Sequence, residues 1–80
     1  MMIPVELVYV PVKRKSDLDA AEVEKLAESI LENGLQLPIS VRADKARKRF
    51  VLVQGLKRLE ATKMLGDEEI RSIIVEARQH

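Results

Sequence analysis

A single amphipathic segment, with clear signals at both ends, limits the possible folds of this chain more than any other part of the sequence. Apolar residues recur at helical spacing at Val23, Leu26, Ala27, Ile30 and Leu31, which predicts a helix with one apolar face. Asp19, followed three residues later by Glu22, is typical of a capping box, and Gly34 is typical of a left-handed helix stop. Because such a face is stable only when it packs against another element, the rest of the chain must supply a partner layer.

Short β-rich runs surround this helix. They occupy residues 3–10, 38–42, 50–54 and 70–77, and proline, glycine or charged residues bound each of them. Residues 11–16 are predicted to form a loop, residues 43–49 the connection of a hairpin, and residues 56–65 a second, shorter helix closed by Gly66. The predicted order is β-α-β-β-α-β. This order is typical of an α+β fold, with a small mixed sheet and two main helices that cover at least one of its faces.

The length and the aromatic content limit the architecture further. Eighty residues allow one domain, which we expect to span residues 1–80. Tyr9 and Phe50 are the only aromatic residues, so the core must be aliphatic. They are too few to form a platform on which nucleic-acid bases stack.

Missing residue types exclude several classes of chemistry. The chain has no cysteine, which excludes disulfides, thiolate zinc sites and thiol nucleophiles. The one histidine is the terminal His80, so no metal site and no serine–histidine catalysis are predicted. No apolar stretch approaches the roughly 18 residues of a membrane-spanning helix, and the N-terminus lacks a signal pattern. We therefore expect a cytoplasmic protein without a membrane partner.

The net charge of +1 hides a polarised distribution. Residues 17–32 carry six acidic residues and one base, whereas residues 42–63 carry eight bases and two acidic residues. Such asymmetry indicates either a site for an anionic ligand or solvated faces without a ligand.

The junction between the third predicted strand and the second helix carries the clearest chemical signal. Gly55 stands where a glycine lets the backbone approach a ligand closely, and the unpaired N–H groups of the following helical turn form an anion site. Lys57 and Arg58 lie in that turn, where cations oppose the helix dipole unless an anion is bound nearby. The pattern is typical of a phosphate site. It is also compatible with an ordinary strand-to-helix turn, so both interpretations are open at this point.

Several short motifs extend over nearly the whole chain. They are Ile-Pro-Val-Glu-Leu-Val at residues 3–8, Leu-Ala-Glu-Ser-Ile at residues 26–30, Asn-Gly-Leu at residues 33–35, Pro-Ile-Ser-Val-Arg at residues 38–42, Gly-Leu-Lys-Arg-Leu-Glu-Ala at residues 55–61 and Leu-Gly at residues 65–66. In this order they resemble the N-terminal domain of the ParB/sulfiredoxin superfamily, often called the ParB-like nuclease domain. The resemblance implies the same compact α+β unit that the periodicity predicts.

The resemblance also implies a nucleotide site. In the family, a Gly-x-x-Arg segment that opens the second helix holds the phosphates of ATP or CTP, which implies a nucleoside triphosphate with Mg²⁺ as the ligand here. The implied phosphate-binding residues are Gly55, Leu56, Lys57 and Arg58 in that segment, Ser29 and Lys25 on one face of the first helix, and Arg14 and Lys15 in the loop after the first strand. For Ser29 and Lys25 an ordinary solvated helix face is the alternative.

Departures from the family pattern narrow the implied activity. Leu56 occupies the position of the catalytic cysteine of sulfiredoxins, which excludes sulfinic-acid reduction by that mechanism. Leu56 and Leu37 also replace polar residues of the partitioning proteins, so CTP recognition here would need other contacts. We expect no helix-turn-helix region and therefore no sequence-specific DNA binding by this chain alone. One branch of the superfamily uses an acidic residue before the first helix as a general base in phosphoryl transfer. Asp17 is the candidate, with a cap or loop role as its alternative.

Three hypotheses for the function follow. The first is a nucleotide-binding module, with weak nucleotide hydrolysis or phosphoryl transfer as an enzymatic extension. The second is a protein associated with DNA or with a DNA-bound protein, which binds nucleic acid without sequence preference or cleaves it. Its candidate contacts are Arg42, Lys45, Arg47, Lys48, Arg49 and Lys63. The third is a non-catalytic interaction module whose acidic first helix faces a basic partner. We favour the first hypothesis.

Overall fold

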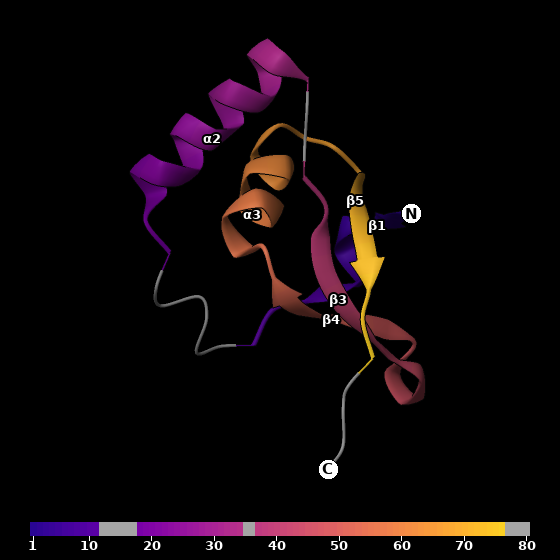
Figure 1. Ribbon diagram of the computed structural model, residues 1–80. Helices are drawn as coiled ribbons and strands as arrows, with labels where there is room; N and C mark the ends of the chain where they lie inside the picture. Colours follow the sequence, from indigo (N-terminus) through magenta and orange to yellow (C-terminus); the bar gives the residue numbers. More distant parts are fainter. Residues whose placement is uncertain (12–17, 35–36, 77–80) are drawn as a thin grey trace.

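The computed structural model describes residues 1–11, 18–34 and 37–76. Its elements, in chain order, are β1 (Met2–Pro4), a 3₁₀ turn η1 (Val5–Leu7), β2 (Val8–Tyr9), α2 (Ala20–Asn33), β3 (Ile39–Asp44), a 3₁₀ turn η2 (Lys45–Arg47), β4 (Arg49–Gln54), α3 (Leu56–Met64) and β5 (Glu69–Ile74). The strands form one sheet in the order β1-β5-β3-β4-β2, with β1–β5 and β3–β4 antiparallel and β3–β5 and β2–β4 parallel. The predicted α+β fold, a mixed sheet with two main helices, is confirmed within the described residues (Figure 1).

The first predicted strand, residues 3–10, is wrong as one continuous strand. Val5–Leu7 form a 3₁₀ turn that divides the run into β1 and β2. β1 pairs with β5 at one edge of the sheet, whereas β2 pairs with β4 at the other edge. The N–H of Val5 donates to the carbonyl of Glu68 at 2.9 Å and holds the turn in place. Local composition could not reveal the break, because it results from pairing with two different distant strands.

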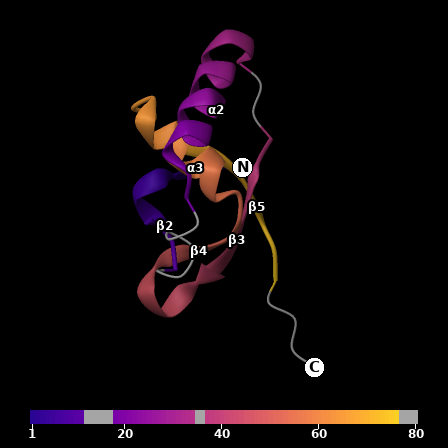
Figure 2. The ribbon, with the colours of Figure 1, turned by 90° about the vertical axis from the view of Figure 1, so that its left-hand side faces the viewer.

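This short connection forces the sheet to curl. Three residues of extended chain reach about 10 Å, and η1 joins the two outermost strands of a five-stranded order. The two edges must therefore lie close to each other in space. Figure 2 shows the strands following one another from β2 through β4 and β3 to β5 beneath α3.

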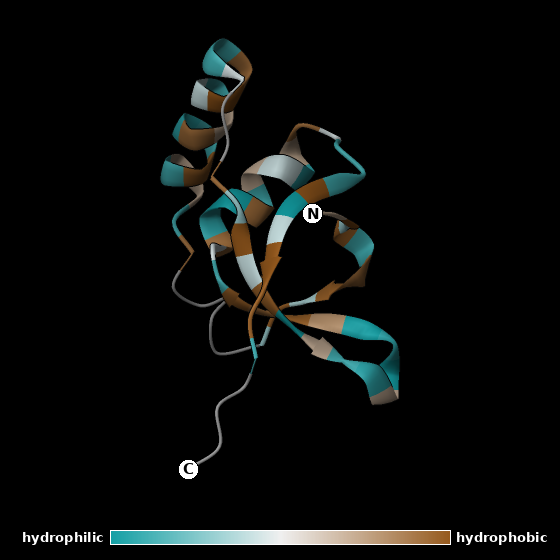
Figure 3. Ribbon diagram, turned by 45° about the vertical axis from the view of Figure 1, so that its right-hand side comes forward, coloured by the Kyte–Doolittle hydropathy of each residue, from teal (hydrophilic) through white to brown (hydrophobic). Residues whose placement is uncertain are grey.

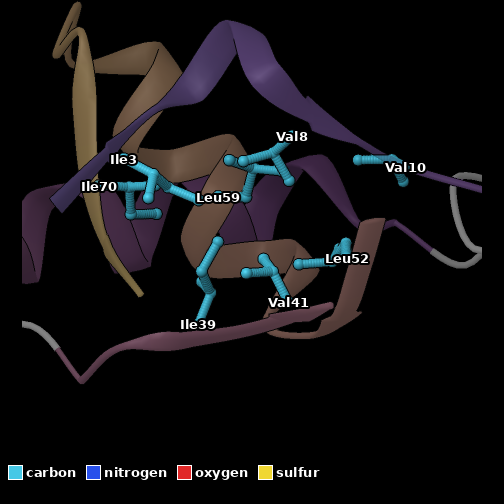
Figure 4. Packing of buried hydrophobic residues seen from close by; sticks show 8 residues of the cluster. All are labelled: Ile3, Val8, Val10, Ile39, Val41, Leu52, Leu59 and Ile70. Atoms are coloured by element: carbon cyan, nitrogen blue, oxygen red, sulfur yellow. The ribbon is translucent and has the colours of Figure 1, made fainter. Parts of the chain in front are cut away.

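The main hydrophobic core lies inside this curl. Its buried side chains are aliphatic, as predicted, and come from the first ten residues, from β3, β4 and β5, and from α3 (Figure 4): Ile3, Val8, Val10, Ile39, Val41, Leu52, Leu59 and Ile70. Leu59 of α3 is completely buried among the strands. The strand β3 alternates between the buried Ile39 and Val41 and the more exposed Ser40, because successive side chains of a strand point to opposite faces.

α2 packs on α3 and forms an outer layer (Figure 1). Val23, Ala27 and Ile30 of α2 are buried against Ala61 of α3. The face predicted from the helical period is therefore the one that packs, except for Leu31, which is 72% exposed. α3 thus contacts the sheet through Leu59 and α2 through Ala61.

Both predicted ends of α2 are confirmed by their hydrogen bonds. The Asp19 carboxylate accepts a hydrogen bond from the N–H of Ala21 at 2.9 Å, and Gly34, with a φ of 66°, donates to the carbonyl of Ile30 at 2.7 Å. The Glu22 carboxylate, which a capping box would direct back to Asp19, pairs with Lys57 of α3 instead. Within the described part of the chain, neither this helix nor any other is long and apolar enough to cross a bilayer.

Candidate functional site

A cleft of about 720 Å³ lies where β3 and β4 meet the N-terminus of α3. Its lining residues are Leu18 and Leu26 on the α2 side, Leu37, Pro38 and Ser40 at the start of β3, Gln54 and Gly55 at the end of β4, and Leu56, Lys57 and Arg58 in the first turn of α3. Half of the lining residues are leucine or proline, and both basic side chains come from the start of one helix. The cleft therefore suits a ligand with an apolar part and an anionic part.

Gly55 is required by the packing of the protein itself. Its φ of 109° is a conformation that residues with a side chain rarely adopt. A Cβ atom at Gly55 would lie 2.7 Å from Cγ2 of Ile39 and 3.2 Å from its Cα. The buried strand β3 thus makes the close approach that the sequence pattern assigned to a ligand. The glycine alone is no indication of phosphate.

The N-terminus of α3 opens toward the cleft. No side chain of the described residues caps it, and the N–H of Leu59 makes the first bond of the helix, to the carbonyl of Gly55 at 2.9 Å. The N–H groups of residues 56–58 precede this bond, so they have no acceptor within the helix. All three of these residues line the cleft. Backbone donors, the positive end of the helix dipole and two cations converge there, and this arrangement stabilises an anion.

The two cations of the cleft have different surroundings. The Lys57 ammonium pairs with the Glu22 carboxylate, so that one ion pair joins the first turns of α3 and α2. Arg58 is partly buried, and its backbone carbonyl accepts a hydrogen bond from the hydroxyl of Thr62 at 2.8 Å. Among the residues that the structure describes, no ion pair involves the Arg58 guanidinium. A ligand that contacts the Lys57 ammonium must therefore share it with Glu22 or displace Glu22, whereas the Arg58 guanidinium has no ion-pair partner among the described residues.

Other predicted phosphate contacts are not part of this cleft. Lys25 and Ser29 are exposed on α2, and the Ser29 hydroxyl accepts a hydrogen bond from Nδ2 of Asn33 at 3.3 Å. Leu26 supplies the contribution of α2 to the lining instead. Three predicted residues, Arg14, Lys15 and Asp17, lie outside the described residues. The structure brings together Gly55, Leu56, Lys57 and Arg58.

The sequence patterns did not identify several lining residues of the cleft, among them Leu18, Ser40 and Gln54. Ser40 and Gln54 are register partners across β3 and β4, and both line it. The alternation of Ser40 with the buried Ile39 and Val41 is a signal that could have placed its side chain on the opposite face. No local signal distinguishes Leu18 as a lining residue, because its position depends on how α2 packs on α3.

The candidate nucleic-acid contacts lie elsewhere, on a surface that we call the basic hairpin. It comprises Arg42, Lys45, Arg47, Lys48 and Arg49, carried by β3, η2 and the start of β4. The Asp44 carboxylate accepts a hydrogen bond from Nε of Arg49 at 3.3 Å, and its Oδ2 lies 3.8 Å from Nη1 of Arg47. The Arg49 guanidinium lies 4.0 Å from the centre of the Tyr9 ring. Figure 3 shows this hydrophilic hairpin extending away from the rest of the sheet.

Lys63, the sixth candidate contact, lies across a hollow of about 310 Å³ from this hairpin. Arg47, Lys48, Arg49 and Tyr9 also line that hollow. Lys63 pairs with Glu60 at 3.3 Å within α3. The structure thus places Arg47, Lys48, Arg49 and Lys63 around one hollow, apart from the cleft. Asp44 pairs with Arg47 and Arg49, and Glu60 pairs with Lys63.

Known proteins match this chain over most of its length. The family model of the ParB N-terminal domain matches residues 2–80. The probable chromosome-partitioning protein ParB of Campylobacter jejuni is 38% identical over 66 residues, which make up 82% of this chain and 23% of that protein. The chain therefore spans less than a quarter of the length of this relative.

Solved structures show the same fold. Sulfiredoxin from Arabidopsis thaliana aligns with a TM-score of 0.79 and 32% sequence identity, over 96% of this chain and 86% of that one. A C-terminally truncated chromosome-partitioning protein ParB from Caulobacter crescentus, complexed with CTP-gamma-S, aligns with a TM-score of 0.81 and 24% identity, over 98% of this chain and 44% of that one. The predicted resemblance to the ParB/sulfiredoxin superfamily is confirmed, and the chain belongs to the ParB N-terminal domain family.

Proposed function

We propose that this chain is a nucleotide-binding module whose cleft holds the phosphates of ATP or CTP at the N-terminus of α3. The observation that carries the proposal is the convergence of uncapped first-turn N–H groups, Lys57 and Arg58 at one end of the cleft. Phosphate oxygens accept from such N–H groups, and a guanidinium binds them in bidentate fashion. The apolar walls offer a surface to the base and the sugar. The complex of the Caulobacter crescentus protein with CTP-gamma-S supports a nucleotide as the class of ligand.

Mg²⁺ is expected to enter the cleft on the phosphates. Among the described residues, no group of three or more His, Cys, Asp or Glu side chains is placed to hold a metal ion. Nucleotide phosphates bind Mg²⁺ themselves while it keeps several waters, so the cleft residues need only hold the phosphates. Weak hydrolysis or phosphoryl transfer is an extension of this proposal, with Asp17 as the candidate base.

Titration of the chain with ATP and with CTP, each with Mg²⁺, tests the proposal. Calorimetry gives the affinity, and amide NMR should place the largest shifts at residues 55–58. Arg58→Ala should weaken binding about tenfold or more, because a hydrogen bond to a charged group contributes about 1.5–3 kcal/mol. Arg71→Ala is the control, since it removes an exposed arginine of β5 that does not line the cleft. A folded protein that binds neither nucleotide at millimolar concentration would overturn the proposal.

A second candidate function is binding of a nucleic-acid backbone by the basic hairpin. Its support is the exposure of Lys45, Arg47 and Lys48 together at the hairpin tip. Such a surface contacts phosphates without reading bases, so binding to plain DNA should decrease steeply with salt. Replacing these three residues by glutamine should lower the dependence of log K on log[salt] by about one for each lost phosphate contact, whereas Arg58→Ala should not. If the folded chain binds neither nucleotide nor DNA, the interaction-module hypothesis gains support.

A further inference from the structure

The Glu22–Lys57 ion pair places an acidic side chain beside a cleft that otherwise attracts anions. Lys57 lines the cleft, and the partner of its ammonium is Glu22. Glu22 lies in the first turn of α2, where the helix dipole stabilises a carboxylate, whereas Lys57 lies in the first turn of α3, where the dipole disfavours a cation. The Glu22 carboxylate is thus an anion of the protein itself, held next to the N-terminus of α3.

We propose that Glu22 is an internal competitor of the phosphates and lowers the affinity of the cleft for them. The inference rests on the proposed nucleotide site and adds a residue that opposes binding. A phosphate that contacts Lys57 must share its ammonium with Glu22 or displace Glu22 from it. The Glu22 charge also repels the negative charge of the ligand. Competition for Lys57 and charge repulsion both weaken phosphate binding, so removal of the Glu22 carboxylate should strengthen it.

The exposure of the pair allows this exchange of partners. The side chains of Lys57 and Glu22 are 52% and 51% exposed. Water solvates both groups when they separate, and such exposed pairs contribute little to stability. The flexible four-carbon stem of lysine lets its ammonium move between neighbouring anions. Lys57 can therefore transfer from the carboxylate to a phosphate without unfolding either helix.

The test is a titration of Glu22→Gln with ATP–Mg²⁺ and CTP–Mg²⁺. Its affinity should exceed that of the original chain about two- to fivefold, the range that corresponds to an exposed ion pair. In a Lys57→Met background the gain from Glu22→Gln should shrink, because competition for Lys57 is then absent and only direct repulsion remains. The double-mutant cycle isolates this difference.

Glu24→Gln is the matched control, since it removes the same charge from an exposed position two residues further along α2. It should change the affinity less than Glu22→Gln does. An unchanged or lower affinity of Glu22→Gln would overturn the inference, and a lower affinity would show that Glu22 positions Lys57 for the ligand. If the original chain binds neither nucleotide, the proposed function fails, and titration of both proteins with inorganic tripolyphosphate decides the role of Glu22. Binding gained in Glu22→Gln then supports competition, and no gain overturns it.

Discussion

The cleft and the basic hairpin both concentrate positive charge, but they present it differently. In the cleft, Lys57 and Arg58 lie beside uncapped N–H groups and apolar walls. On the hairpin, more cations are present, but they are spread over an exposed loop that Asp44 partly neutralises. Figures 1 and 2 place this hairpin and α2 at opposite ends of the molecule. The number of charges thus favours the hairpin, whereas directed backbone donors and the larger volume, about 720 Å³ against about 310 Å³ beside the hairpin, favour the cleft as a site for a discrete ligand.

The largest effect is expected at the glycine that builds the cleft. Gly55→Ala should lower the free energy of unfolding by about 2–4 kcal/mol, because its Cβ would meet Ile39 and its φ is strained. In Gly34→Ala the φ is also positive, but no atom lies within 4 Å of the added Cβ, so the loss should be about 1 kcal/mol. Urea denaturation measures both values. Equal losses would show that Ile39 moves aside and that the cleft does not depend on this contact.

Single arginine-to-alanine substitutions compare the cleft and the basic hairpin directly. Arg58→Ala should cost nucleotide binding about 1.5–3 kcal/mol, and Arg47→Ala, on the exposed hairpin, should change it less than about twofold. For DNA binding, Arg47→Ala should lose more affinity than Arg58→Ala does. Calorimetry with ATP or CTP and a fluorescence titration with duplex DNA measure the two affinities. If both variants lose the same affinity for nucleotide and for DNA, overall positive charge governs binding, and the cleft and the hairpin are not separate sites.

Asp44, the acidic residue of the hairpin, should stabilise the hairpin turn and reduce the positive charge of the hairpin. Asp44 accepts a hydrogen bond from the N–H of Arg47 at 3.4 Å and one from Arg49 at 3.3 Å. Asp44→Ala should therefore cost about 1 kcal/mol of stability, raise the affinity for DNA and leave that for nucleotide unchanged. Asp67→Ala removes an exposed acidic residue outside the hairpin and controls for net charge. If Asp44→Ala gave the same thermal unfolding curve as the original chain, Asp44 would not stabilise η2 as its N-terminal cap.

The smallest effect concerns the stacking of Arg49 on Tyr9. Tyr9→Leu should lower stability by about 0.5–1 kcal/mol, the usual contribution of an exposed cation–π pair. Tyr9→Phe keeps the ring and should unfold like the original chain. Chemical denaturation of the three proteins measures the difference, and equal losses in both variants would assign the effect to the hydroxyl.

The success of sequence-based prediction depended on the range of the interaction. The ends of α2 were predicted correctly because Asp19 and Gly34 act on backbone groups within four residues. The run at residues 3–10 was misassigned, because its division depends on β4 and β5, which lie 40 or more residues further along the chain. The lining of the cleft shows the same contrast: a local motif singled out residues 55–58, whereas Ser40 and Gln54 join the cleft only through strand pairing.

Composition, periodicity and local motifs were sufficient for the α+β class, the aliphatic core and the polarised charge, and they singled out residues 55–58, which line the cleft. Packing between distant segments determined the rest. It set Gly55 against Ile39, paired Lys57 with Glu22, and left Lys25 and Ser29 outside the cleft. These contacts join residues that are far apart in sequence, and their geometry arises only when α2, α3 and the sheet pack together.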